Sequence, residues 1–130
     1  MPKENVVKIL AWLLLLAAVL PYVAAVAAKA GGKGFDNKQP RVWLQNQQGW
    51  RSRANAAQQN LLEGLPFFFV AVLFALWRNV APEDVAPWIL AWILVRLLYI
   101  GAYIADRGTV RSILWAVALG LNIGILFLAL

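Results

Sequence analysis

The chain has 130 residues, of which 62% are hydrophobic and 14% are charged, and its net charge is +6. Soluble domains carry about 25% charged residues, so this composition predicts a membrane protein of one domain, residues 1–130. The sequence has no Cys and no His. This excludes disulfides, Cys nucleophiles, His general bases and ordinary zinc sites, and we expect no metal site. The basic residues form no dense run, so we expect no nucleic-acid partner.

The first apolar run covers residues 9–28, which is long enough at about 1.5 Å per residue to cross a hydrocarbon core of about 30 Å. We expect Pro21 to kink this helix. The stretch also has the layout of a signal peptide, with two lysines before an apolar core and the sequence AKA after it. The run continues past Pro21 for longer than a signal peptide requires, which favours a transmembrane helix.

Three further helices follow a polar loop over about residues 30–51, in which Pro40 is expected to resist regular structure. Pro66 is expected to bend the second helix, and Arg107–Gly108 is read as a tight turn before the last helix. The fold class is therefore an all-α membrane protein, a bundle of four transmembrane helices. Their expected ranges are about 5–29, 52–78, 85–105 and 109–130.

Basic residues are concentrated in the first and third loops, whereas the second loop holds only Arg78 against two acidic residues. Positively charged loops remain on the cytoplasmic side of a membrane. We therefore expect an integral protein of a bacterial inner membrane, with loops one and three in the cytoplasm and both termini outside.

Polar residues recur at helical spacing beside these cytoplasmic ends. On the second helix, Arg53, Ala56, Asn60, Glu63 and Phe67 form one stripe, and on the third helix a second stripe comprises Arg96, Tyr99, Tyr103 and Asp106. Arg111 lies near the start of the fourth helix. Such groups are costly within a membrane unless they face a protein interior or a ligand.

Glu63 and Arg96 are the obvious ion pair among these residues. One interpretation is structural: a buried pair that fixes the register of the helices, although desolvation offsets much of its Coulomb gain. The other is a ligand site. The arginines, tyrosines and amides exceed what one carboxylate requires, which favours a polyanionic, peptide-like ligand that enters from the cytoplasm.

Two segments resemble a known family. RANAAQQNLLEGLP, from Arg53 to Pro66, is similar to the signature Arg-Ala-x-x-Ala-x-x-Asn-x-x-Glu-x-x-Pro of the membrane-associated proteins in eicosanoid and glutathione metabolism (MAPEG). RLLYIGAYIADRGTVR, from Arg96 to Arg111, resembles the family's third-helix segment and the start of its last helix. The four-helix layout and the length also match, so the chain is identified as a bacterial-type member.

The resemblance implies a homotrimer that binds glutathione as a co-substrate between neighbouring subunits, in a cavity open to the cytoplasm. Asn60 and Glu63 would hold its peptide backbone and amino group, and Gln59 would add a side-wall contact. Its carboxylates and γ-glutamyl part would be held by Arg96, Tyr99 and Tyr103. Arg111 would lie by the sulfur and favour the thiolate, because a nearby cation lowers the pKa of a thiol from its ordinary value near 8.5. The full set of implied binding residues is Arg53, Gln59, Asn60, Glu63, Arg96, Tyr99 and Tyr103.

The implied function is a membrane transferase or peroxidase that uses glutathione on an apolar small-molecule electrophile or a lipid hydroperoxide. One departure from the family is Ala56, because many catalytic members have Arg four residues before the Asn. Arg107 could also take the role at the sulfur. Two alternatives therefore stay open: a non-catalytic member that binds membrane lipids or acts as a scaffold, and a small transporter based on the intramembrane carboxylate of Glu63.

Overall fold

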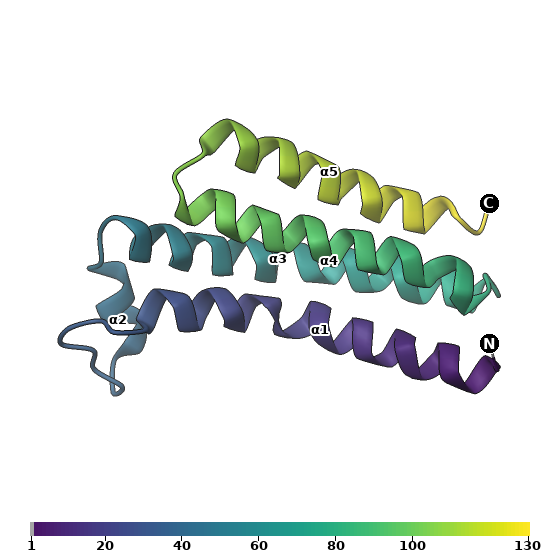
Figure 1. Cartoon of the computed structure of the whole chain (residues 1–130), viewed down its shortest axis with the longest axis horizontal. Coiled ribbons are helices and arrows are strands. Elements are labelled where there is room, and N and C mark those ends of the chain that lie inside the picture. Colours follow the sequence, from purple (N-terminus) through teal and green to yellow (C-terminus); the bar gives the residue numbers. More distant parts are fainter. Residues whose placement is uncertain (1) are drawn as a thin grey trace.

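In the computed structural model, which describes residues 2–130, the chain is a bundle of long helices (Figure 1). Four helices are long and apolar enough to cross a membrane, so the expected four-helix membrane fold is confirmed. Their bounds differ from the expected ranges by a turn or less. The helices are α1 (Lys3–Lys29), α2 (Pro40–Gln45), α3 (Trp50–Trp77), α4 (Pro82–Ile104) and α5 (Gly108–Phe127).

The short helix α2 was not expected, because Pro40 was read as resisting regular structure. Pro40 instead opens this helix, a position where the missing N–H of proline removes no hydrogen bond. Pro21 and Pro66 lie inside α1 and α3, and both helices continue through them. The helix α2 lies at the end of the bundle where α1 ends (Figure 1).

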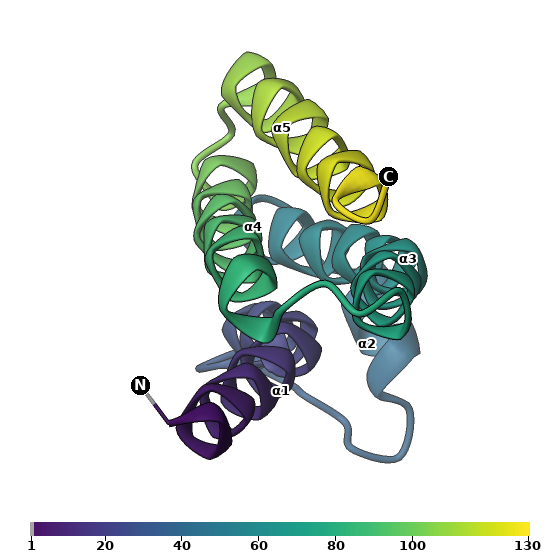
Figure 2. The same ribbon diagram turned by 90° about the vertical axis from the view of Figure 1, so that its right-hand side faces the viewer.

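The helices α3 and α4 pack against each other, and both contact α1 and α5, so that α1 and α5 lie on opposite sides of this central pair (Figure 2). The largest cluster of buried residues joins the four long helices. Within it, the rings of Phe68 and Trp92 stack with centroids 3.9 Å apart. Leu10, Ala17 and Leu20 of α1 belong to this core, which supports reading α1 as a transmembrane helix.

The turns after α3 and α4 are built in the same way. Asn79 and Asp106 adopt positive φ angles of 63° and 59°, and Asn and Asp adopt this left-handed conformation more readily than most residues. The following N–H groups of Val80 and Arg107 then bond to carbonyls of the last helical turn at 3.0 and 2.9 Å, which is the usual C-terminal helix cap. The chain therefore reverses direction within a few residues after α3 and again after α4.

The outer faces of the bundle are apolar. Trp12, Leu73 and Leu98, for example, each expose more than 60% of their surface. A water-soluble monomer rarely exposes so much contiguous apolar area, whereas hydrocarbon chains solvate it. Together with the four spans, this makes the chain an integral membrane protein.

Candidate functional site

A groove bounded by α3, α4 and α5 collects most of the polar side chains that the sequence singled out. It consists of two hollows that share Asn60 and Trp115 as lining residues. The outer hollow, of about 280 Å³, is lined by Asn60, Tyr99, Tyr103, Arg111, Ser112 and Trp115. The inner hollow, of about 310 Å³, is lined by Asn60, Glu63, Gly64, Phe67, Trp92, Arg96, Trp115, Ala118, Leu119 and Asn122.

Arg96 is the most buried charged residue of the groove, with only 2% of its surface exposed. Its Nη2 donates to Asn60 Oδ1 at 3.0 Å and to the Asn60 main-chain oxygen at 3.2 Å. Its guanidinium also lies over the ring of Tyr99, 4.5 Å from the centroid. Gly64 lies next to the guanidinium, since a Cβ there would be 3.4 Å from Nη2. The cation is thus fixed at the wall of the groove.

The expected ion pair between Glu63 and Arg96 does not form. Within residues 2–130 the ion pair present joins Lys8 to Glu4 at 3.1 Å, near the start of α1. The prediction was wrong because Asn60, one turn earlier on α3, is level with the guanidinium and takes its hydrogen bonds. Glu63 is exposed and lines the inner hollow, so its carboxylate is left for another partner.

The outer hollow combines two tyrosines with a cation. The rings of Tyr99 and Tyr103 meet edge to face, with centroids 5.7 Å apart. Arg111 is half-buried, and its guanidinium lies 4.4 Å from the centroid of the Tyr103 ring. Arg107 is exposed and precedes the first turn of α5, and it does not line either hollow.

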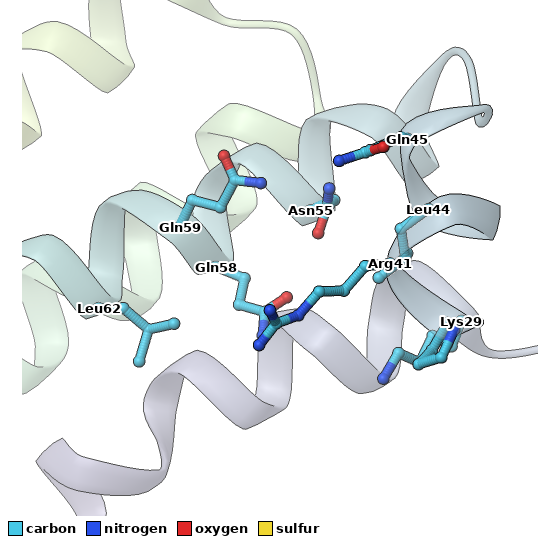
Figure 3. A pocket seen from close by; sticks show the side chains of 9 residues that line it. Lys29, Arg41, Leu44, Gln45, Asn55, Gln58, Gln59 and Leu62 are labelled. Atoms are coloured by element: carbon cyan, nitrogen blue, oxygen red, sulfur yellow. The ribbon is translucent and has the colours of Figure 1, made fainter. Parts of the chain in front are cut away.

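Two residues of the expected set lie outside the groove. Arg53 donates from Nε to the main-chain oxygen of Ile104 at 3.0 Å, so it ties the start of α3 to the last residue of α4. Gln59 lies on a different face of α3, in a third hollow of about 430 Å³ that we call the side hollow (Figure 3). It is lined by Lys29, Pro40, Arg41, Leu44, Gln45, Asn55, Gln58, Gln59 and Leu62.

The side hollow is basic and rich in amides. Lys29 comes from the end of α1 and Arg41 from α2, and Figure 3 shows the Arg41 side chain reaching toward Gln58 of α3. Its lining includes no acidic residue. It can therefore offer hydrogen bonds and positive charge to an anion at this end of the bundle.

Sequence reasoning did not assign Trp92 and Asn122 to the site. Asn122 is a lone amide in an apolar helix, eleven positions after Arg111. Eleven residues are close to three helical turns, so this spacing alone places both residues on the same face of α5. Trp92 lies one turn before Arg96 on α4, but in a sequence its indole cannot be told from an ordinary apolar residue.

One comparison with known proteins gives a match. The model of the MAPEG family matches residues 9–130, which include every residue of both hollows. No curated protein and no solved structure gives a significant match to the chain.

Proposed function

Since this chain belongs to the MAPEG family, we propose that it is a glutathione-dependent membrane transferase or peroxidase whose second substrate is an apolar electrophile or a lipid hydroperoxide. Family membership supports a role related to glutathione. The residues of the groove support the more specific assignment, as argued below.

The observation that carries the proposal is the charge pattern of the groove. Arg96 and Arg111 present two cations, and Glu63 presents one carboxylate; none of the three has an ion-pair partner within residues 2–130. Glutathione carries two carboxylates, one ammonium group and a thiol. Its charges are therefore complementary to those of the groove, and Tyr99, Tyr103 and Asn60 add neutral hydrogen-bonding groups.

Arg111 is the residue we assign to the sulfur. A thiol with an ordinary pKa near 8.5 is mostly protonated at neutral pH, and a fixed cation beside it stabilises the thiolate, which is the nucleophile. With an electrophile, the thiolate forms a carbon–sulfur bond and displaces the leaving group. With a hydroperoxide, two glutathione molecules give the disulfide, and the hydroperoxide gives an alcohol and water.

The second substrate would reach the sulfur from the bilayer. Trp115 and Leu119 of α5 line the inner hollow and are exposed in the single chain, and we place this wall of the groove against lipid. An apolar molecule dissolved in the membrane can approach there without crossing water. Trp115 also borders the outer hollow, which would bring such a molecule toward Arg111.

A neighbouring subunit would complete the site, which accounts for the position of Gln59. The groove is open on one side, and Gln59 lies in the side hollow with Lys29 and Gln58. If the side hollow of one copy faces the groove of the next, these residues reach glutathione held by that copy. We propose this arrangement within a homotrimer, with the basic end of the bundle in the cytoplasm.

The substitution Arg111→Gln tests the proposal. In the wild-type protein, bound glutathione should show the ultraviolet absorbance of a thiolate at neutral pH. In Arg111→Gln the pKa of the bound thiol should return toward its ordinary value near 8.5, so this absorbance and the turnover should fall about tenfold or more. Glutathione should still raise the unfolding temperature, since the other contacts remain.

Arg107→Gln is the matched control, because Arg107 lies four residues away but outside both hollows. It should keep the thiolate absorbance. If Arg107→Gln loses it and Arg111→Gln keeps it, the two roles are exchanged. If wild-type protein is not stabilised by glutathione at all, the glutathione assignment is wrong.

A second candidate function is lipid binding without catalysis. It is favoured by Ala56, which is half-buried and supplies no hydrogen-bond donor where many catalytic relatives have Arg. Saturable binding of lipid, together with no effect of millimolar glutathione on thermal unfolding, would favour this function over the transferase.

A further inference from the structure

A further hollow, which we call the end hollow, lies at the end of the bundle away from α2 (Figure 1). Its volume of about 390 Å³ is larger than that of either hollow of the groove. It is bordered by the start of α1, the end of α3 and the turn into α4. Its lining residues are Lys3, Val7, Leu76, Asn79, Val80, Ala81, Pro82 and Glu83. The groove and the side hollow share no lining residue with it, so it is separate from the proposed glutathione site.

The end hollow lies at the level of the lipid head groups. The helix α1 has 27 residues, which gives a length of about 40 Å, more than a hydrocarbon core of about 30 Å. Its first two turns carry Lys3, Glu4 and Lys8, and the first turn of α4 carries Glu83 and Asp84. Charged groups are costly within hydrocarbon, so this end of both helices projects into the head-group region.

The end hollow presents two opposite charges that do not pair with each other. Within residues 2–130 the ion pair present joins Lys8 to Glu4, so the Lys3 ammonium group and the Glu83 carboxylate both lack an ion-pair partner there. Asn79 adds an amide from the turn after α3, where its φ angle is 63°. The hollow can therefore hold an anionic and a cationic group at the same time.

A phospholipid with an ethanolamine head group matches this pattern. Its phosphate would accept hydrogen bonds from Lys3 and Asn79, and its ammonium group would donate to Glu83. Inorganic phosphate and the head group of phosphatidylglycerol would meet the Glu83 charge with no cation of their own. A metal ion would meet a single carboxylate beside a lysine. The choline head group has a quaternary nitrogen, which donates no hydrogen bond.

The apolar part of the lining suits the chains of such a lipid. Val7 of α1 is 54% exposed, and Leu76 and Val80 are partly buried against the main core. Leu73, one turn before Leu76 on α3, is 61% exposed. An apolar surface therefore continues from the end hollow toward the middle of the membrane. A lipid can use this surface, whereas a soluble head-group compound cannot.

We propose that the end hollow binds phosphatidylethanolamine from the leaflet away from α2, with Lys3 at the phosphate and Glu83 at the ammonium group. The bound head group would join the start of α1 to the start of α4, two segments that are far apart in the sequence. This proposal does not rest on the glutathione site, and the experiment below needs no glutathione.

Three lipids with the same acyl chains separate the contacts. Phosphatidylethanolamine, phosphatidylcholine and phosphatidylglycerol are each titrated into the detergent-solubilised protein, and apparent dissociation constants are obtained from the rise in unfolding temperature. A charged contact near the surface changes affinity by up to about fivefold, so wild-type protein should bind phosphatidylethanolamine about fivefold more tightly than the other two. Soluble phosphoethanolamine should bind more weakly than any of the lipids, because it lacks the acyl chains.

Two substitutions each remove one of the contacts. Glu83→Gln should abolish the preference for phosphatidylethanolamine over the other two lipids. Lys3→Gln should weaken the binding of all three lipids and keep the preference, because each of them has a phosphate. Asp84→Asn and Lys8→Gln are the matched controls, since they make the same charge changes on the same helices outside the end hollow. They should leave both the affinities and the preference unchanged.

Three results would overturn the proposal. In the first, wild-type protein binds the three lipids equally. In the second, Asp84→Asn reduces the preference as much as Glu83→Gln does, which would assign the effect to surface charge in general. In the third, soluble phosphoethanolamine binds as tightly as the lipid, which would make the ligand a soluble compound. Lys3 and Glu83 are exposed, so the variants should fold, and thermal unfolding without added lipid checks this.

Discussion

At the scale of single residues, three arginines of this chain make three different kinds of contact. Arg53 links α3 to α4 by a hydrogen bond to the main-chain oxygen of Ile104. Arg96 is buried and held by an amide. The guanidinium of Arg111 lies over the Tyr103 ring and has no ion-pair partner within residues 2–130. Its charge can therefore bind an anion. Arginine suits all three contacts because its planar guanidinium donates hydrogen bonds, stacks on aromatic rings and stays charged. The residue type alone therefore does not show which contact a given arginine makes.

Arg53→Met tests whether Arg53 is structural. Because the charged donor bonds to a backbone carbonyl of Ile104 at 3.0 Å, its loss should lower the free energy of unfolding by about 1.5–3 kcal/mol. The stabilisation gained from added glutathione should stay the same. Both quantities come from thermal unfolding in detergent, with and without glutathione.

Arg41→Met is the control, since Arg41 is exposed and makes no protein hydrogen bond among the described residues; stability should hardly change. A result in which Arg53→Met keeps its stability but no longer responds to glutathione would restore Arg53 to the ligand site, as the family resemblance implies.

The sequence could indicate which residues share a face, but not which partner each one meets. The spacing of Asn60 and Glu63 puts both on one side of α3, and both do line the inner hollow. Whether Arg96 meets Asn60 or Glu63 depends on how far α4 is shifted along α3. A shift of one turn exchanges the two partners, and no pattern within either helix fixes it.

At the scale of elements, the long helices were predictable because each is an apolar run of sufficient length. The short helix α2 was not, since six residues give no periodicity and its proline was read as a breaker. The family membership inferred from two short segments is confirmed over residues 9–130. The packing between helices could not be predicted in this way, because it depends on single small residues.

Gly124→Ala tests this dependence between α4 and α5. A Cβ at Gly124 would lie 2.3 Å from Cζ3 of Trp88, closer than any real contact, so the indole must move. Overpacking of this kind should lower the free energy of unfolding by about 1–3 kcal/mol, measured as a lower unfolding temperature in detergent.

Gly120→Ala is the matched control on the same helix, because a Cβ there meets no atom within 4 Å. It should raise the free energy of unfolding slightly, by up to about 1 kcal/mol, because Ala favours a helix more than Gly does. Equal effects of the two substitutions would show that the loss comes from an added methyl group on α5 in general and not from the contact with Trp88.

At the scale of the whole molecule, the groups suited to an anionic peptide lie on two faces of α3. Asn60 and Glu63 line the inner hollow, whereas Gln58 and Gln59 line the side hollow. One chain cannot bring Gln58 and Asn60 to the same ligand, because two residues turn a helix by about 200° and the body of α3 lies between these side chains. A second copy can, and this is the physical reason for placing the proposed site between subunits.

Mixed oligomers test this directly. One chain carries Arg111→Gln, and the other carries Gln58→Leu with Gln59→Leu; each alone should turn over at a small fraction of the wild-type rate. When the two are expressed together, some interfaces pair an intact groove from the second chain with an intact side hollow from the first. Such interfaces are native in every contact, so glutathione turnover should recover to a sizeable fraction of the wild-type rate, measured on the purified mixed oligomer against either parent. If each site lay within one chain, every site in the mixture would keep a defect, and no recovery would occur.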